Sequence, residues 1–329
     1  MAAPPRPRWS WRSRSGRALL WQLLVVGVIV ALLALLVAQT VANMHARGIH
    51  SGFGFLAQSA GFDISEGWFG YQPSDPIWKA LGVGLLNTLR VAIPAIVATT
   101  LLGTLLGIAR FSSNVLARGL AQGYVELFRN IPLLLQLLMW YLLLVEYLPD
   151  PQQPLALGQW FLLSKSGLAF PTLTAGGLSL PRVDGFAIEG GASISPEFLA
   201  LLLGLTLYTA AFVAEIVRGG IAALPRGQLE AAASLGLSRT QTLRLVTLPQ
   251  ALRVIIPPLT NQYLNLTKNS SLAVAIGYPE LVSVANTTLN QSGRAVECIA
   301  IIMAVYLLLS LLTALVMGIY NRRALLPGA

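Results

Sequence analysis

The residues with the most specific spacing lie in a polar segment, 227–249. The spacing is Glu-Ala-Ala, three residues, Gly, nine residues, Val, one residue and Leu-Pro, which here are Glu230, Ala231, Ala232, Gly236, Val246, Leu248 and Pro249. Residues 228–235 favour a helix, Gly236 suits the left-handed position that ends one, and Ser238 can cap a second helix running to Pro249. The helices would share an apolar face, formed by Ala231, Ala232, Leu235, Leu243 and Val246. Such a face is suited to docking in a partner's groove rather than to bond-making chemistry.

A helix-turn-helix can also read DNA, so the same segment has a second interpretation. The flanking sequence on both sides is apolar for a length that fits a membrane span, starting within about ten residues. That leaves the segment little freedom to enter a major groove about 12 Å wide. We therefore expect no nucleic acid as a partner.

A second group of polar residues lies within or beside apolar stretches, where each needs a physical reason. Arg129 and Asn130 precede Pro132, which would break a helix, and freed backbone groups at such a break can line a pathway. Gln136 follows one and a half turns later and would face the same lumen. Lys268 and Asn269 sit deep in another apolar stretch, where they suit either interhelical hydrogen bonds or a substrate carboxylate. Both the structural and the substrate-contacting interpretation stay open for these residues.

Three further charges have mainly structural interpretations. Arg90 lies about ten residues into an apolar stretch, where it would face a partner helix bundle or a wet cavity, with substrate contact as the alternative. Glu215 and Arg218 are three residues apart and would pair on one helical face.

The sequence lacks the residue patterns of an ATP-binding loop, an intrachain disulfide and a zinc site. None of the three lysines, Lys79, Lys165 and Lys268, follows a glycine, so the chain has no Gly-Lys-Ser/Thr loop to cradle ATP phosphates. The single Cys298 forms no intrachain disulfide, and His45 and His50 have no second pair of zinc ligands. We expect no catalytic residue, no metal and no cofactor in this chain.

The elements that position these residues are membrane helices. The sequence is 55% hydrophobic and 11% charged, against about 45–50% and about 25% in soluble domains. Stretches near the roughly 20 residues that cross a bilayer recur along the chain. We predict an all-α polytopic protein with about six spans, and up to eight, at 18–38, 81–108, 131–148, 197–217, 255–278 and 296–319.

Basic residues orient these spans. Fifteen Lys and Arg fall on the side we predict to be cytoplasmic and five on the other, which are Arg47, Lys79, Lys165, Arg182 and Arg294. By the positive-inside rule, both termini are cytoplasmic. Five arginines precede the stretch 18–38, which fits a signal peptide or an anchor; its full spanning length and the lack of a closing A-x-A site favour a retained helix.

Two segments outside the spans are harder to interpret. Residues 155–173 are apolar, but Lys165 and three Gly or Pro residues interrupt them, so we predict 149–196 to be an external loop with an interfacial piece. The loop 39–80 is rich in glycine and shows no usable periodicity.

The Glu-Ala-Ala spacing resembles the EAA signature of permease subunits in ABC importers. Three further stretches, LYTAAFVAEIVRGGI (207–221), YVELFRNIPLLLQLL (124–138) and YLNLTKNSSLAVAIGY (263–278), look like the polar and general L-amino-acid permeases of the histidine/glutamine permease group. The external RGIHSGFGFLAQSAGFDIS (47–65) resembles its broad-specificity branch, and the resemblance covers about residues 45–325.

The resemblance implies a type I ABC importer permease fold in the bacterial inner membrane. The domains would be a cytoplasmic Arg-rich tail 1–17, a transmembrane helix 18–38, a periplasmic loop 39–80, an importer transmembrane domain 81–323 with its coupling loop at 227–249, and a C-terminal tail 324–329. It also implies the partners: separate ATPase subunits that bind the ATP, a second permease that is an identical chain or a paralogue, a periplasmic amino-acid-binding protein, and membrane lipid.

Two other functions compete with this interpretation. A secondary transporter would use an ion gradient in a single chain, and such carriers often carry inverted repeats, which we do not find here. An exporter or channel would not need the EAA loop.

Overall fold

The computed structural model describes residues 14–46, 52–67, 70–174 and 177–325. The chain divides into two compact units, Met1–Phe53 and Gly54–Ala329. Most of the predicted tail 1–17, and residues 326–329 of the tail predicted at 324–329, lie outside the described residues.

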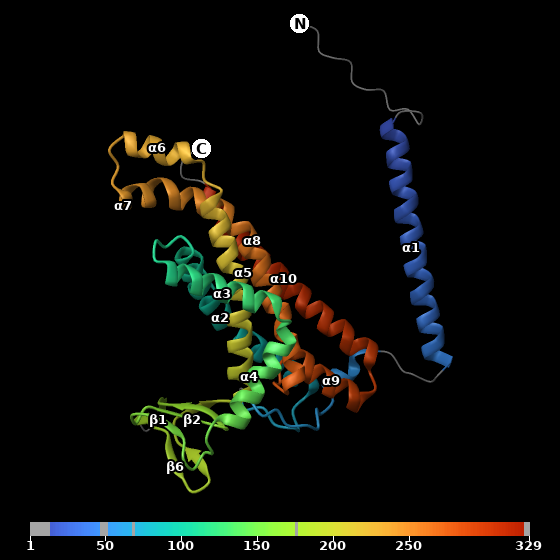
Figure 1. The fold of residues 1–329 in the computed structure, drawn as a ribbon. Helices are drawn as coiled ribbons and strands as arrows, with labels where there is room; N and C mark the ends of the chain where they lie inside the picture. The colour runs from blue at the N-terminus through green and yellow to red at the C-terminus, as the bar shows by residue number, and fades with distance from the viewer. Residues whose placement is uncertain (1–13, 47–51, 68–69, 175–176, 326–329) are drawn as a thin grey trace. The chain divides into compact units, whose positions relative to one another are not determined.

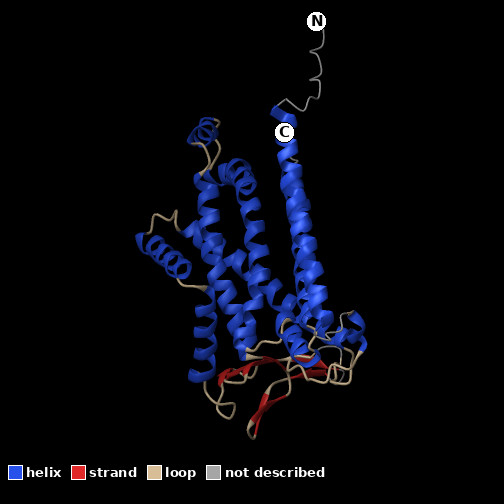
Figure 2. Cartoon of the chain, turned by 90° about the vertical axis from the view of Figure 1, so that its right-hand side faces the viewer, coloured by secondary structure: helices blue, strands red, loops and turns tan. Residues whose placement is uncertain are grey.

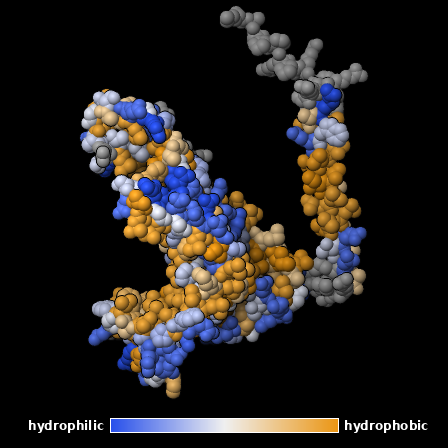
Figure 3. Space-filling view, viewed as in Figure 1, coloured by the Kyte–Doolittle hydropathy of each residue, from blue (hydrophilic) through white to orange (hydrophobic). Residues whose placement is uncertain are grey.

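The first unit is built on one helix, α1 (Arg14–Ala46). The span predicted at 18–38 lies inside it. Its apolar side chains are exposed along its length, and they form the orange band on this helix in Figure 3. Leu and Val side chains in such a band are more stable in contact with lipid tails than in contact with water.

The second unit is a bundle of helices (Figure 1). In chain order its helical elements are η1 (Phe53–Ala57, which starts at the unit boundary), α2 (Ile77–Ala109), α3 (Val115–Asn130), α4 (Leu133–Tyr147), α5 (Pro196–Ala222), α6 (Arg226–Ser234), α7 (Arg239–Thr242), η2 (Leu243–Thr247), α8 (Leu248–Asn269), η3 (Ser270–Ile276), α9 (Leu281–Ser292) and α10 (Ala295–Leu325).

Helix α5 is the centre of the bundle and packs against α2, α3, α4 and α8. Its approach to α2 depends on two glycines four residues apart. A Cβ at Gly103 would lie 2.6 Å from Cβ of Val213, and one at Gly107 would lie 2.8 Å from Cβ of Val217. The small-xxx-small pattern lets the two backbones approach closely, as membrane helices commonly do.

The segment before α2 folds into the core. Side chains of Phe55, Ile64 and Tyr71 are buried in a cluster with residues of α2, α9 and α10. A backbone bridge joins Ser59 to Pro76. The loop predicted at 39–80 is therefore largely structured: α1 extends to Ala46 and α2 begins at Ile77.

Residues 149–196 form short antiparallel strands, not the loop with an interfacial piece that we predicted. One sheet has the order β1-β2-β3-β8, and β4-β5 and β6-β7 are two-stranded hairpins. The strands are β1 (Leu155–Leu157), β2 (Phe161–Ser164), β3 (Gly167–Phe170), β4 (Thr172–Thr174), β5 (Gly177–Ser179), β6 (Arg182–Asp184), β7 (Ala187–Glu189) and β8 (Ala192–Ile194). They gather at one end of the helices (Figure 2). The glycines that weaken a helix here instead make tight turns, as at Gly185 with φ +57°.

Four helices among the described residues are long and apolar enough to cross a membrane: α1, α2, α5 and α10. A fifth span is possible if α3 and α4, which meet at 104°, are counted as one broken span. The remaining predicted span, 255–278, is helical from Leu248 to Asn269 and then turns into η3. It carries Asn261, Gln262, Asn265, Lys268 and Asn269, which explains its lower hydropathy.

Candidate functional site

The end of α6 has the geometry that the Glu-Ala-Ala spacing predicts. Gly236 has φ +77°, and its N–H donates to the carbonyl of Ala233 at 2.9 Å. The N–H of Leu237 donates to the carbonyl of Ala232 at 3.1 Å. These two bonds form a Schellman motif, which needs a left-handed residue at Gly236.

The second arm of the loop begins with a reciprocal cap. The N–H of Gln241 donates to Oγ of Ser238 at 3.3 Å, and the N–H of Ser238 donates to Oε1 of Gln241 at 2.9 Å. We expected this helix to end at Pro249, but it continues beyond that residue. It passes through the π turn η2 into α8, with the N–H of Leu248 bonded to the carbonyl of Leu243. Pro249 has no N–H to donate, and the wider turn accommodates it at the start of α8.

The exposed face of the loop differs in part from the one we predicted. Ala232 is 2% exposed, and its helix α6 packs on η2 of the second arm. Glu230, Ala231 and Pro249 are exposed, and Val246 is half-buried. Leu235 is 81% exposed, and Leu243, Leu245 and Leu248 are also exposed. Exposed apolar side chains on both arms of a helix pair mark an interaction surface.

An ion-pair cluster connects α2 to the helix that leads into this loop. Glu215 pairs with Arg218, as the three-residue spacing predicts, and also with Arg110 at the end of α2. The second bond needs the α2–α5 packing, and the linear sequence carries no signal for it.

The predicted pathway residues of the α3–α4 break do not line one space. Gln136 is 2% exposed, and its Nε2 donates to the carbonyls of Phe128 at 3.0 Å and Ile131 at 2.9 Å. It therefore satisfies the backbone of the break instead of facing a lumen. Asn130 donates to the carbonyl of Glu126, and the Arg129 guanidinium lies 5.2 Å from the ring centroid of Phe212 on α5.

The Phe212 side chain is also part of the wall of a polar cavity of about 190 Å³ between α5 and α8. Its lining includes Tyr208, Thr209 and Phe212 from α5, and Gln262, Asn265, Leu266 and Asn269 from α8. Of the predicted residues, Asn269 lines the cavity, and Lys268, which precedes it on α8, is exposed. Gln262 and Asn265 were not predicted, although the spacings of three residues from Gln262 to Asn265 and four from Asn265 to Asn269 place all three on one helical face.

Among the residues that the structure describes, no group of three or more His, Cys, Asp or Glu side chains could hold a metal ion. His50 lies outside that part of the chain.

The sequence and fold of this chain are similar to those of known transport proteins. Residues 99–325 match the family described as "Binding-protein-dependent transport system inner membrane component". The chain is 43% identical to "Putative amino-acid ABC transporter permease protein YhdX" of Escherichia coli (strain K12), over 95% of each chain. It is 39% identical to "General L-amino acid transport system permease protein AapQ" of Rhizobium johnstonii, over 96% of this chain and 95% of that one. A solved structure described as "Crystal structure of an amino acid ABC transporter with histidines" matches with a TM-score of 0.56 and 28% identity, over 74% of this chain and 94% of that chain.

Proposed function

The chain belongs to the family of binding-protein-dependent transport system inner membrane components, and we propose that it forms part of the path by which L-amino acids enter the cell. It is a permease subunit of an amino-acid ABC importer and not an enzyme. ATP hydrolysis takes place on a separate ATPase subunit. A periplasmic binding protein delivers the substrate, and a second permease, identical or paralogous, completes the path.

The observation that carries this proposal is the α6–Gly236–α7 loop. It presents exposed Leu235 at the end of its first arm and exposed Leu243 and Leu245 on its second arm, and the second arm continues into α8. Motion of an ATPase groove that held this loop would therefore pass directly into a helix that lines the polar cavity. We place this end of the unit, together with both chain termini, in the cytoplasm.

The cavity between α5 and α8 is the candidate substrate path. Its amide groups, Gln262, Asn265 and Asn269, can donate and accept hydrogen bonds without fixed charge. Arg129, whose guanidinium lies 5.2 Å from the centroid of the Phe212 ring, and exposed Lys268, which precedes Asn269 in the sequence, supply positive charge that suits a carboxylate in transit. Asn130 remains a candidate at the α3–α4 break.

Co-purification with the ATPase subunit tests the coupling role. Leu235→Asp places a charge on the exposed apolar surface of the loop, so the ATPase should no longer co-purify with the permease. Phe186→Asp is the matched control: Phe186 is 85% exposed against 81% for Leu235, and it lies in the strand region at the other end of α5. Equal retention of the ATPase by both variants would contradict this role for the loop.

A further inference from the structure

A second, larger cavity lies at the opposite end of α5 from the coupling loop. It has a volume of about 510 Å³ and opens among α2, α5, the β2–β3 turn, β8 and the segments around Glu66 and Pro279. Helix α5 runs for 27 residues between this cavity and α6, which corresponds to about 40 Å. Under the proposed orientation the cavity is on the external side.

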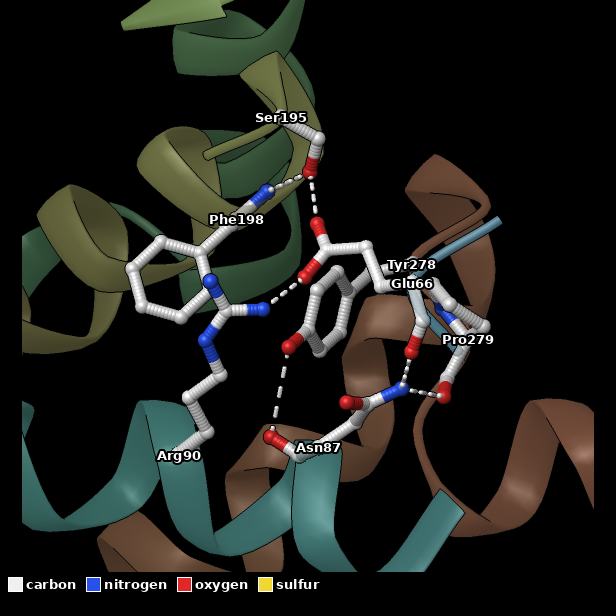
Figure 4. Close-up of polar contacts among 7 residues, drawn as sticks. All are labelled: Glu66, Asn87, Arg90, Ser195, Phe198, Tyr278 and Pro279. Atoms are coloured by element: carbon white, nitrogen blue, oxygen red, sulfur yellow. Dashed lines mark hydrogen bonds and ion pairs between the residues drawn. The ribbon is translucent and has the colours of Figure 1, made fainter. Parts of the chain in front are cut away.

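The wall of this cavity holds an ion pair of unusual connectivity (Figure 4). Glu66, in the segment before α2, pairs with Arg90 of α2 through one carboxylate oxygen. Its other oxygen accepts from the hydroxyl of Ser195, the N-cap of α5. The Arg90 guanidinium also lies 4.9 Å from the centroid of the Phe198 ring. One carboxylate thus joins three elements that are distant in sequence.

Hydrogen bonds fix the backbone around the ion pair. Asn87, which is fully buried, donates to the carbonyls of Glu66 at 3.1 Å and Pro279 at 2.9 Å. Tyr278 donates to the carbonyl of Asn87 at 3.3 Å. The side chains of Glu66 and Arg90 are 12% and 25% exposed, so they keep an open side, and both line the cavity.

Breaking a partly buried ion pair normally leaves two uncompensated charges. A ligand that carries one positive and one negative group removes this cost, because each group replaces one partner. The carboxylate and ammonium of a free α-amino acid are such a pair. The serine hydroxyls of Ser65, Ser166 and Ser193, also on the wall, can bond either group. The volume falls in the range of about 300–1,000 Å³ that is typical of small-molecule sites.

We propose that this cavity is a binding site for free α-amino acids, in which Arg90 holds the α-carboxylate and Glu66 the α-ammonium. The amino acid exchanges with the ion pair and so releases Glu66 from α2 and from Ser195. Recognition rests on the groups that all amino acids share, so the site accepts different side chains. This inference rests on the proposed transport of L-amino acids.

Cysteine protection tests the site directly in the assembled transporter. The one native cysteine, Cys298, is buried, so background labelling is low. Ser166 is exposed and lines the cavity, whereas Ser74 is exposed and does not. Ser166→Cys and Ser74→Cys are each labelled with a membrane-impermeant maleimide, with and without L-glutamine. At ten times the half-protecting concentration, labelling at position 166 should slow about elevenfold, and labelling at position 74 should not change.

Two analogues of glutamine, each without one of its two charged groups, serve as ligand controls. 4-Aminobutanamide lacks the carboxylate and glutaramic acid lacks the amine, so neither should protect position 166 at the same concentration. Protection by either alone as strong as by L-glutamine would overturn the two-charge recognition. Unchanged labelling with L-glutamine would overturn the site.

Two variants separate binding from support of the fold. In the Ser166→Cys background, Arg90→Gln should abolish protection. Ser193→Leu keeps Glu66 and Arg90 but puts an apolar side chain on the cavity wall, so it should weaken protection; normal protection in this variant would overturn the proposal even if Arg90→Gln fails to insert. ATP-driven uptake by the original complex is measured in parallel. Uptake without protection refutes this site alone, whereas loss of uptake in the original complex refutes the proposed function.

Discussion

Replacing Gly236 tests whether the turn between the two arms of the coupling loop is what transmits force. Its φ of +77° is a conformation that L-residues adopt at a cost of about 1–2 kcal/mol. A Cβ added at Gly236 meets nothing within 4 Å, so the cost comes from backbone strain and not from a clash at Cβ. A penalty of that size changes the population of the Schellman turn about 5- to 30-fold.

We therefore expect Gly236→Val to stay in the membrane at normal abundance but to lose most of the ATP hydrolysis that depends on substrate and binding protein. Gly236→Ala should lose less, because alanine is not β-branched, and Gly236→Asn should lose least, because asparagine tolerates the left-handed region. The assay is ATPase activity and uptake by the reconstituted complex.

Gly227→Val is the matched control. Gly227 lies in α6, a Cβ there also meets nothing within 4 Å, and its φ is not left-handed. This variant should hydrolyse ATP as the original does. Full coupling in Gly236→Val would refute the reasoning, and so would equal losses in the two valine variants.

Four further changes have expected outcomes. Gly103→Ala should destabilise the α2–α5 packing by about 1–3 kcal/mol, because the new Cβ lies 2.6 Å from Val213, while Gly82→Ala meets nothing within 4 Å; equal melting temperatures in detergent would contradict this. Gln136→Leu should cost about 1–3 kcal/mol for each carbonyl left without a donor at the α3–α4 break, and an unchanged melting temperature would return Gln136 to the pathway. Glu215→Gln leaves Arg110 and Arg218 without their shared carboxylate, so ATP hydrolysis should depend less on substrate; unchanged stimulation would limit Glu215 to surface pairing. Lys268→Met should lower uptake but not abundance, because removing a cation eases insertion; normal uptake would make Lys268 a structural residue.

Local patterns in the sequence predicted the parts of the structure that depend on local physics. Long apolar runs identified α2, α5 and α10, and the cap residues Gly236 and Ser238 marked the turn of the coupling loop. Each of these depends on the conformational preference of one residue or on the hydropathy of a single stretch.

The features that were missed depend on how the chain folds back on itself or on elements too short to show a pattern. Nothing near Gln136 indicates that its amide would bond two carbonyls of the preceding helix end. Nothing near Arg90 indicates Glu66, since the two meet only when the segment before α2 folds back on the helix. The strands of 149–196 were missed because each is only three or four residues long, too short for periodicity to separate from a loop.

Helix α8 shows the limit of hydropathy as a guide. Three of the amides that lower its apolar character, Gln262, Asn265 and Asn269, line the cavity with α5. A helix that lines a polar path needs such residues, so its weak hydropathy follows from the function proposed for it.

Uptake by purified components in liposomes tests the central claim most directly. The chain is reconstituted with its ATPase, its second permease and its binding protein, and radiolabelled L-glutamine is supplied outside with ATP inside. We predict accumulation that requires both ATP and the ATPase subunit. Uptake by this chain alone, driven by a proton or sodium gradient, would contradict the account and identify a secondary transporter instead.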